Sequence, residues 1–314
     1  MKKILFVSLL IILLILAGCK LVKKESKNEP LGAYIGGKTG LSISFLEKAP
    51  PDEVYDNNQD EFDIGLRLEN QGEYTVPPNK VIASLSGIRA EDFSISNLNN
   101  ILSTSIESKT VRAGTEVRGS EEELVFEAAK YKHDLKADFT ADIIVHTCYD
   151  YKTYAVTSAC LKKDLLEREV VDTCEVTNNA LNYDSSSAPI QISNAAQIPR
   201  GKNSIKLTFD ISNDGTGEVY LPNAFTNTCY GKEDSRDQVK VKVDSPAGKL
   251  SIKCKTLSDS SEGTVKLIDG KRTVDCTIDT GSVQDVSFEN PVLIEVSYFY
   301  REYVSKKITV LAGE

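Results

Sequence analysis

Residues 61–72 read EFDIGLRLENQG, and the pattern of this stretch decides the fold class. Apolar residues alternate from Phe62 to Leu68, which is the period of a β-strand with one buried face. Asn70 and Gly72 then predict a turn, because both residue types tolerate positive φ. The stretch therefore predicts a half-buried strand that ends in an Asn-x-Gly turn.

The pattern returns later in the chain. Residues 205–215 read IKLTFDISNDG, and their Asn-x-Gly lies 143 residues after the first one. A second pair of markers behaves in the same way, since residues 149–154 read YDYKTY and residues 298–303 read YFYREY, 149 residues further on. Two markers in the same order at nearly the same offset predict a duplicated domain.

The rest of the chain is typical of an all-β protein. Short alternating strands recur with turn signals between them, which favours two tandem immunoglobulin-like β-sandwich domains. A charged stretch at 162–169 predicts the boundary, with a first domain over 40–163 and a second over 170–314. The two tyrosine motifs are expected at hairpin turns, so that each domain closes with a strand, a tight turn and a returning strand.

The pattern of the first 39 residues predicts a targeting segment and a stalk, not part of the hydrophobic core. Residues 1–18 have a basic start and an apolar run, which is typical of a signal peptide or anchor helix, and residues 19–39 form a polar stalk. Leu16-Ala17-Gly18-Cys19 fits a lipobox, which predicts lipidation of Cys19. An uncleaved helix is the alternative, although the apolar run is short of the about 20 residues that span a bilayer. Either anchor predicts an extracytoplasmic body on the outer face of the cell membrane.

Six further cysteines predict three disulfides, because the number is even, no Cys-x-x-Cys pair is present and the chain is expected outside the cell. They are Cys148, Cys160, Cys174, Cys229, Cys254 and Cys276.

The pairing of these cysteines follows from the repeat and the expected hairpins. Cys148 and Cys160 are symmetric about residue 154, so they would face each other across the first tyrosine hairpin. The expectation for Cys254 and Cys276 is also a bridge, because they flank a strand-turn-strand unit. Cys174–Cys229 is left by elimination.

Composition and motifs argue against catalysis. The net charge of −9 disfavours a nucleic-acid partner. The chain has two histidines, and His146 lies two residues before Cys148, but a bridged cysteine has no thiolate to act as a nucleophile. No serine-hydrolase elbow or zinc-protease motif occurs. We therefore expect a non-enzymatic protein.

Three further patterns each have a structural and a functional reading. Residues 32–39 match the P-loop formula, but a strand-like stretch follows where a phosphate site needs a helix, so we expect no nucleotide. An acidic stretch after residue 51 is a weak candidate for Ca²⁺ and otherwise a solvated loop, since its spacing fits no EF-hand. Its carboxylates are Asp52, Asp56, Asp60 and Asp63. The paired tyrosines either form a sugar-stacking platform or pack in the core. They are Tyr149, Tyr151, Tyr298 and Tyr300.

The Asn-x-Gly strand ends, together with a few short motifs, resemble the CARDB-like and related immunoglobulin-like modules of membrane-anchored archaeal surface proteins. These motifs are GG at 36–37, APPDEVY at 49–55, CYDY at 148–151 and EVSYFY at 295–300. The resemblance covers about residues 40–314. It implies β-sandwiches and a place on the cell surface, and it carries no catalytic residue or cofactor.

The sequence thus favours a structural or adhesive surface protein that presents loops to a protein or glycan partner. A solute- or glycan-binding lipoprotein is the second hypothesis, and an accessory factor in envelope assembly or secretion is the third.

Overall fold

A computed structural model describes residues 34–112, 114–165, 173–176, 179–246, 250–283 and 287–313, and these belong to one compact unit. The prediction of an all-β fold is confirmed, because the described residues form antiparallel sheets and no α-helix. None of the described residues lies in a helix long and apolar enough to cross a membrane. Cys19, the signal or anchor segment and most of the expected stalk lie outside the described residues.

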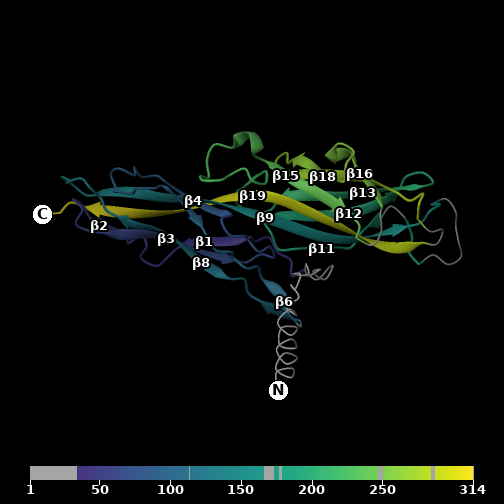
Figure 1. The fold of residues 1–314 in the computed structure, drawn as a ribbon, viewed down its shortest axis with the longest axis horizontal. Coiled ribbons are helices and arrows are strands. Elements are labelled where there is room, and N and C mark those ends of the chain that lie inside the picture. The colour runs from purple at the N-terminus through teal and green to yellow at the C-terminus, as the bar shows by residue number, and fades with distance from the viewer. Residues whose placement is uncertain are drawn as a thin grey trace, which may run out of the picture. The chain divides into compact units, whose positions relative to one another are not determined.

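Two long strands form the centre of the fold, β9 (Phe139–Leu161) and β19 (Phe288–Leu311) (Figure 1). They pair antiparallel along their whole shared length without a register shift, and Asp150 lies opposite Phe299 near the middle. The predicted hairpins are therefore wrong, because 150–154 and 301–303 continue their strands instead of turning. Burial alternates along 149–154 of β9, and in β19 the run Tyr298–Tyr300 is buried throughout, so both motifs stay within their strands and contribute side chains to the core.

The first half of the chain lays a three-stranded sheet over one end of this pair, in the order β1 (Leu41–Phe45), β3 (Phe62–Asn70) and β8 (Glu121–Ala129). The remaining strands of this half extend the large sheet or stand apart. They are β2 (Glu53–Tyr55), parallel to β19, β4 (Val81–Ser86) and β5 (Asn99–Leu102), which follow β9, and the separate hairpin of β6 (Thr110–Arg112) and β7 (Thr115–Val117).

The second half repeats the plan with a five-stranded sheet. Its order is β10 (Asn179–Ala180), β12 (Ile190–Pro199), β13 (Ser204–Asn213), β18 (Lys271–Asp279) and β16 (Ser251–Cys254). The other strands of this half join the large sheet. They are β11 (Tyr183–Ser185), which pairs with β9, and β14 (Glu218–Tyr220), β15 (Gln238–Asp244) and β17 (Glu262–Lys266), on the side of β19.

The structure supports the duplication that the sequence predicts. Leu41 of β1 pairs with Asn70, and Ile190 of β12, 149 residues later, pairs with Asn213 in the same manner. The two halves are not separate bodies, however, because both long strands run through both of them and one hydrophobic cluster is continuous between them. The division into two domains at 162–169 stays a prediction.

All six cysteines expected in disulfides are bridged, and one of the three predicted pairs is correct. Cys254 and Cys276 lie directly opposite each other on β16 and β18. A bridge there needs only a local strand pair, which the sequence pattern reveals.

The other two predicted pairs are wrong. Cys148 and Cys160 stand on the same strand, about 40 Å apart at the usual rise per residue, so they cannot bond to each other. Cys148 is joined to Cys229, 81 residues away, and Cys160 is joined to Cys174. The error follows from the hairpin that the chain does not form. These bridges are consistent with an oxidising, extracytoplasmic environment.

Candidate functional site

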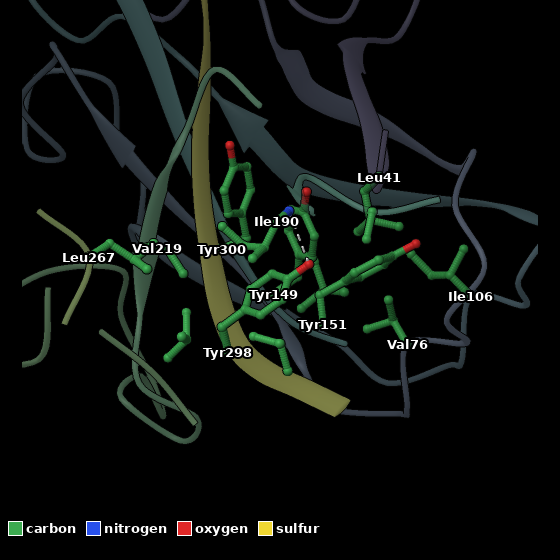
Figure 2. Close-up of a cluster of buried hydrophobic side chains, with 14 of the residues drawn as sticks. Leu41, Val76, Ile106, Tyr149, Tyr151, Ile190, Val219, Leu267, Tyr298 and Tyr300 are labelled. Carbon is green, nitrogen blue, oxygen red and sulfur yellow. Dashed lines mark hydrogen bonds between the residues drawn. The ribbon is translucent and has the colours of Figure 1, made fainter. Parts of the chain in front are cut away.

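The four paired tyrosines are core residues and not a ligand platform. Tyr149 and Tyr151 lie on the core face of β9, their counterparts Tyr298 and Tyr300 lie on the core face of β19, and all four are fully buried. Tyr149 is opposite Tyr300 and Tyr151 is opposite Tyr298 in the strand register. Figure 2 shows the rings gathered between apolar residues of both halves. Burial excludes the sugar-stacking interpretation.

The repeated Asn-x-Gly motif holds these tyrosines. Tyr151 donates its hydroxyl to Asn70 Oδ1 at 3.0 Å, and Tyr300 donates to Asn213 Oδ1, also at 3.0 Å. The glycine that follows is needed because a Cβ at Gly72 or Gly215 would collide with the hydroxyl oxygen of the same tyrosine. Neither asparagine nor glycine has positive φ, so the predicted reason for the motif is corrected: it makes room for a hydroxyl group.

The carboxylates of the acidic stretch serve local structure. Asp56 is buried and accepts the N–H groups of Leu135 and Gly313, which hold the pKa of its carboxyl below the usual value. Asp60 accepts from Tyr55 and Asp63 accepts from Ala128, while Asp52 pairs with a lysine. Among the residues that the structure describes, no three acidic, histidine or cysteine side chains are grouped as metal ligands.

The described part of the P-loop-like stretch, residues 34–39, also binds within the protein. The backbone N–H groups of Ile35 and Gly36 donate hydrogen bonds to the carboxylate of Glu73, at 2.8 and 3.0 Å. Strand β1 follows at Leu41. An internal carboxylate thus occupies the N–H groups that a phosphate would use, and the helix that a phosphate site needs does not follow.

The candidate site is an open cleft of about 850 Å³ along one edge of β19, next to β1. Its lining comes from both halves of the chain: the start of β1 and the preceding residues, Gln71, His146 of β9, the stretch before β14, and residues 301–305 of β19.

A cluster of charged groups forms one end of the cleft. Arg301 of β19 donates from Nε and Nη2 to one carboxylate oxygen of Glu218 of β14, and Arg236 binds the other oxygen of the same carboxylate. The Arg301 guanidinium also donates to the carbonyl of Cys229 and lies over the ring of Tyr220. Burial alone would raise the pKa of the Glu218 carboxyl, but the hydrogen bonds and charge of Arg301 outweigh it and lower the pKa. The lowered pKa keeps the Glu218 carboxylate ionised between the two arginines.

His146, which the sequence singled out, lines the same cleft. Its ring contacts the rings of Tyr230 and Tyr303, with centroids 5.3 and 5.7 Å away. Partial burial lowers the pKa of the imidazole, and the charge of Arg301 lowers it further. Cys148 is bonded to Cys229, so no thiolate lies beside the histidine. The histidine therefore presents a neutral aromatic ring to the cleft at neutral pH.

Glu302 lies on the core side of the same edge. Its carboxylate accepts hydrogen bonds from the hydroxyl groups of Tyr149, at 3.1 Å, and Thr216, at 3.3 Å. Burial raises the pKa of this carboxyl group, and the two hydroxyl donors only partly offset that effect. Tyr298, the counterpart of Tyr149, bonds to Thr153 at the position that matches Glu302. The two copies therefore differ here, because an acidic residue lies at 302, beside the cleft, where the matching position in the other copy is a threonine.

The edge of β19 along the cleft lacks a partner strand. β14 pairs with β19 as far as Arg301, and β2 begins to pair at Thr309. Within the described ranges, no strand pairs with 302–308 on that side. Thr309 donates its N–H toward β2, and strand residues alternate, so the N–H and C=O groups of Tyr303, Ser305 and Lys307 also point out from this edge.

Sequence reasoning found His146 but missed the rest of this site. Arg301 and Tyr303 belong to the repeated tyrosine motif, and the repeat drew attention to what the copies share. The useful signal was where the copies differ, since Glu302 replaces Thr153 and Arg301 replaces Lys152 at the offset of 149.

Comparisons with known proteins define no family for this fold. No family model matches the chain, and no curated protein matches it. Among solved structures, the secreted serine protease VesC from Vibrio cholerae aligns with 82% of this chain at 10% identity and a TM-score of 0.18. The alignment covers 50% of the VesC chain, so this chain spans about half the length of that protein. A likeness at that score carries no argument about the fold or activity.

Proposed function

We propose that this protein is a non-enzymatic surface protein that binds another polypeptide outside the cell. In this proposal its two halves are tandem immunoglobulin-like sandwiches of the CARDB-like kind, fused through a common sheet and tethered to the membrane by the N-terminal segment, with a lipid on Cys19 or as a helix. The disulfides support the location, since they rigidify a body exposed to oxidising surroundings.

The observation that carries the proposal is the cleft beside β19. It joins an open strand edge to exposed aromatic and ionised side chains, and 66% of the Tyr303 surface is exposed. Aromatic residues and arginines are enriched at the centres of protein interfaces. The buried tyrosines and the acidic stretch are used by the fold itself, so the cleft is where binding is expected.

The test is photo-crosslinking on intact cells that make the full-length protein. One variant carries a benzophenone side chain at Tyr303, and a control carries it at Ile268, which is similarly exposed at 60% but does not line the cleft. We expect an adduct with one defined extracytoplasmic polypeptide from position 303 and not from 268. Equal adducts from both positions, or none from 303, would overturn the proposal. Saturable binding of a glycan instead would support the second hypothesis.

A further inference from the structure

One difference between the two halves lies at the seam between the small sheet and the edge of the large sheet. In the second half this seam is filled, because β11 adds to the edge of β9 with Tyr183, Asp184 and Ser185 opposite Thr157, Val156 and Ala155. In the first half the corresponding seam is the open cleft beside β19. Counting 149 residues from Ala155–Thr157 leads to residues 304–306, inside the unpaired edge.

The chain directs the matching segment elsewhere. The same offset relates Tyr183–Ser185 to residues 34–36, which would fill the first seam if the two halves were alike. Instead, Tyr34 donates its N–H to Asp184, and Ile35 and Gly36 donate theirs to Glu73. The described residues thus leave the β19 seam without the strand that its counterpart contains.

We propose that this seam is a strand-acceptor groove, which takes an extended segment of a partner protein as an added strand beside residues 303–307. The inference rests on the proposed function and specifies how the partner binds. Added strands gain affinity from backbone hydrogen bonds and specificity from alternate side chains. About seven residues are open, or roughly 23 Å of strand, and β14 and β2 close the two ends.

The occupied seam indicates the chemistry of the segment. There, Ser186 donates its N–H to the carbonyl of Tyr154 at 2.8 Å, and Tyr154 donates its N–H back to the Ser186 hydroxyl at 2.9 Å. Leu181, on the same segment, packs against the core. Tyr303 matches Tyr154 at the offset of 149, so its backbone offers the same donor and acceptor. The partner segment should alternate an apolar side chain toward Val304 and Ile43 with small hydroxyl residues.

The competing explanation of the unpaired edge is that its side chains protect it from pairing with another strand. Strand edges are often protected from association by lysines, and Lys306 and Lys307 stand on this one. Lys306 is already used, since its ammonium group binds the Pro50 carbonyl at 2.7 Å and Asp52 at 2.9 Å. A guarded edge predicts no saturable binding of a strand, whereas an acceptor groove predicts it.

The test uses the chain's own filling segment as the probe. A fluorescent synthetic peptide of residues 179–188, NALNYDSSSA, is titrated into the full-length protein, with anisotropy as the readout. In Ser305→Pro the outward N–H is lost, while the bonds of β19 to β9 are made by its neighbours. Ser305→Ala keeps the N–H and is the matched control. We expect saturable binding that Ser305→Pro weakens about tenfold and Ser305→Ala leaves within about twofold.

Hydrogen exchange supplies a second readout that does not depend on one variant. Bound peptide should slow the exchange of the Ser305 and Lys307 amides, and a peptide methylated at alternate backbone nitrogens should not. Absence of saturable binding, or equal binding by both Ser305 variants, would overturn the inference. The inference would also be overturned if these amides were already protected in the free protein. Loss of that protection on dilution would show that a second copy fills the seam, and loss on deletion of residues 20–31 would show that the chain's own N-terminal segment fills it.

The two proposals can fail separately. If benzophenone at Tyr303 still captures its polypeptide when Ser305 is proline, the cleft binds a partner but not by strand addition. If no polypeptide is captured while the peptide binds as predicted, the groove is competent but the proposed partner function is wrong.

Discussion

At the residue scale, a tyrosine hydroxyl, an asparagine amide and a missing Cβ form one device that occurs twice. Tyr151 with Asn70 and Tyr300 with Asn213 are matched, but the surroundings of the two asparagines differ. Each tyrosine hydroxyl also accepts a backbone N–H from the residue four positions after its asparagine, Tyr74 in the first copy and Gly217 in the second. Gly72 donates its N–H to Asn70 Oδ1 at 3.1 Å, whereas Gly215 donates its N–H to the carbonyl of Pro189, also at 3.1 Å.

This difference predicts unequal costs for the same deletion. Each Tyr→Phe change leaves a backbone N–H without its acceptor, so each should cost about 1–3 kcal/mol of unfolding free energy. Tyr300→Phe should cost more, because Tyr151→Phe leaves Asn70 Oδ1 with the Gly72 N–H as a donor, whereas the Gly215 N–H is bound to the Pro189 carbonyl. Urea denaturation of both variants measures the difference. A larger loss for Tyr151→Phe would contradict the assignment.

Glu302 predicts a pH dependence of stability. Burial raises the pKa of its carboxyl in the folded state, so the folded protein binds a proton more readily than the unfolded chain. The contribution of Glu302 is most favourable below the unfolded pKa, and it is lost as pH rises through the folded pKa. Asp150 shifts in the same direction, so wild type must be compared with a variant at 302 alone.

Glu302→Gln is that variant, because an amide keeps an acceptor for Tyr149 and cannot ionise. Its unfolding free energy relative to wild type should increase as pH rises from about 4 toward neutrality, beginning near the usual glutamate pKa. Urea unfolding at several pH values follows this. A difference that stays constant with pH would show that Glu302 has no raised pKa.

At the element scale, the pairing of β9 with β19 makes neighbouring positions unequal. Val304 lies opposite Val145 and turns its N–H toward β9, while Ser305 turns its N–H outward to the open edge. Val304→Pro should therefore cost about 1–3 kcal/mol more than Ser305→Pro, because it removes a ladder hydrogen bond and leaves its acceptor unpaired, whereas proline is tolerated at strand edges. Thermal and urea unfolding compare them. Equal losses would mean that both sides of β19 are paired there.

The same strands show where sequence reasoning succeeded and where it could not. The pattern of residues 62–68 and 205–211 predicted strands, and both exist, as β3 and β13. Periodicity within one segment cannot show which distant segment pairs with it. The two tyrosine motifs were therefore expected at turns, whereas in the structure they continue long strands and Asp150 and Arg301 lie on the outer face.

The disulfides follow the same division. Cys254–Cys276 depends on two strands close in sequence, and its prediction was correct. Cys148–Cys229 depends on the outer face of the large sheet, where the loop after β14 brings Phe225 and Cys229 against Phe299. No local pattern contains that contact. The cleft was missed for a similar reason, because it arises where the two copies differ.

At the scale of the whole molecule, the account describes one body built on two continuous strands, with a duplicated plan and one unfilled seam. The long strands place Cys148 and Cys160 far apart on β9, and this forces each of them to a different partner. A pair of separate hairpin-closed domains would instead bring Cys148 and Cys160 together. The connectivity of the cysteines therefore distinguishes the two architectures without any substitution.

The most direct test is a mass-spectrometric map of the non-reduced protein after proteolysis. The account predicts peptides that link Cys148 to Cys229, Cys160 to Cys174 and Cys254 to Cys276. A peptide linking Cys148 to Cys160 would contradict the continuous β9–β19 pair, and with it the seam on which the proposed binding depends.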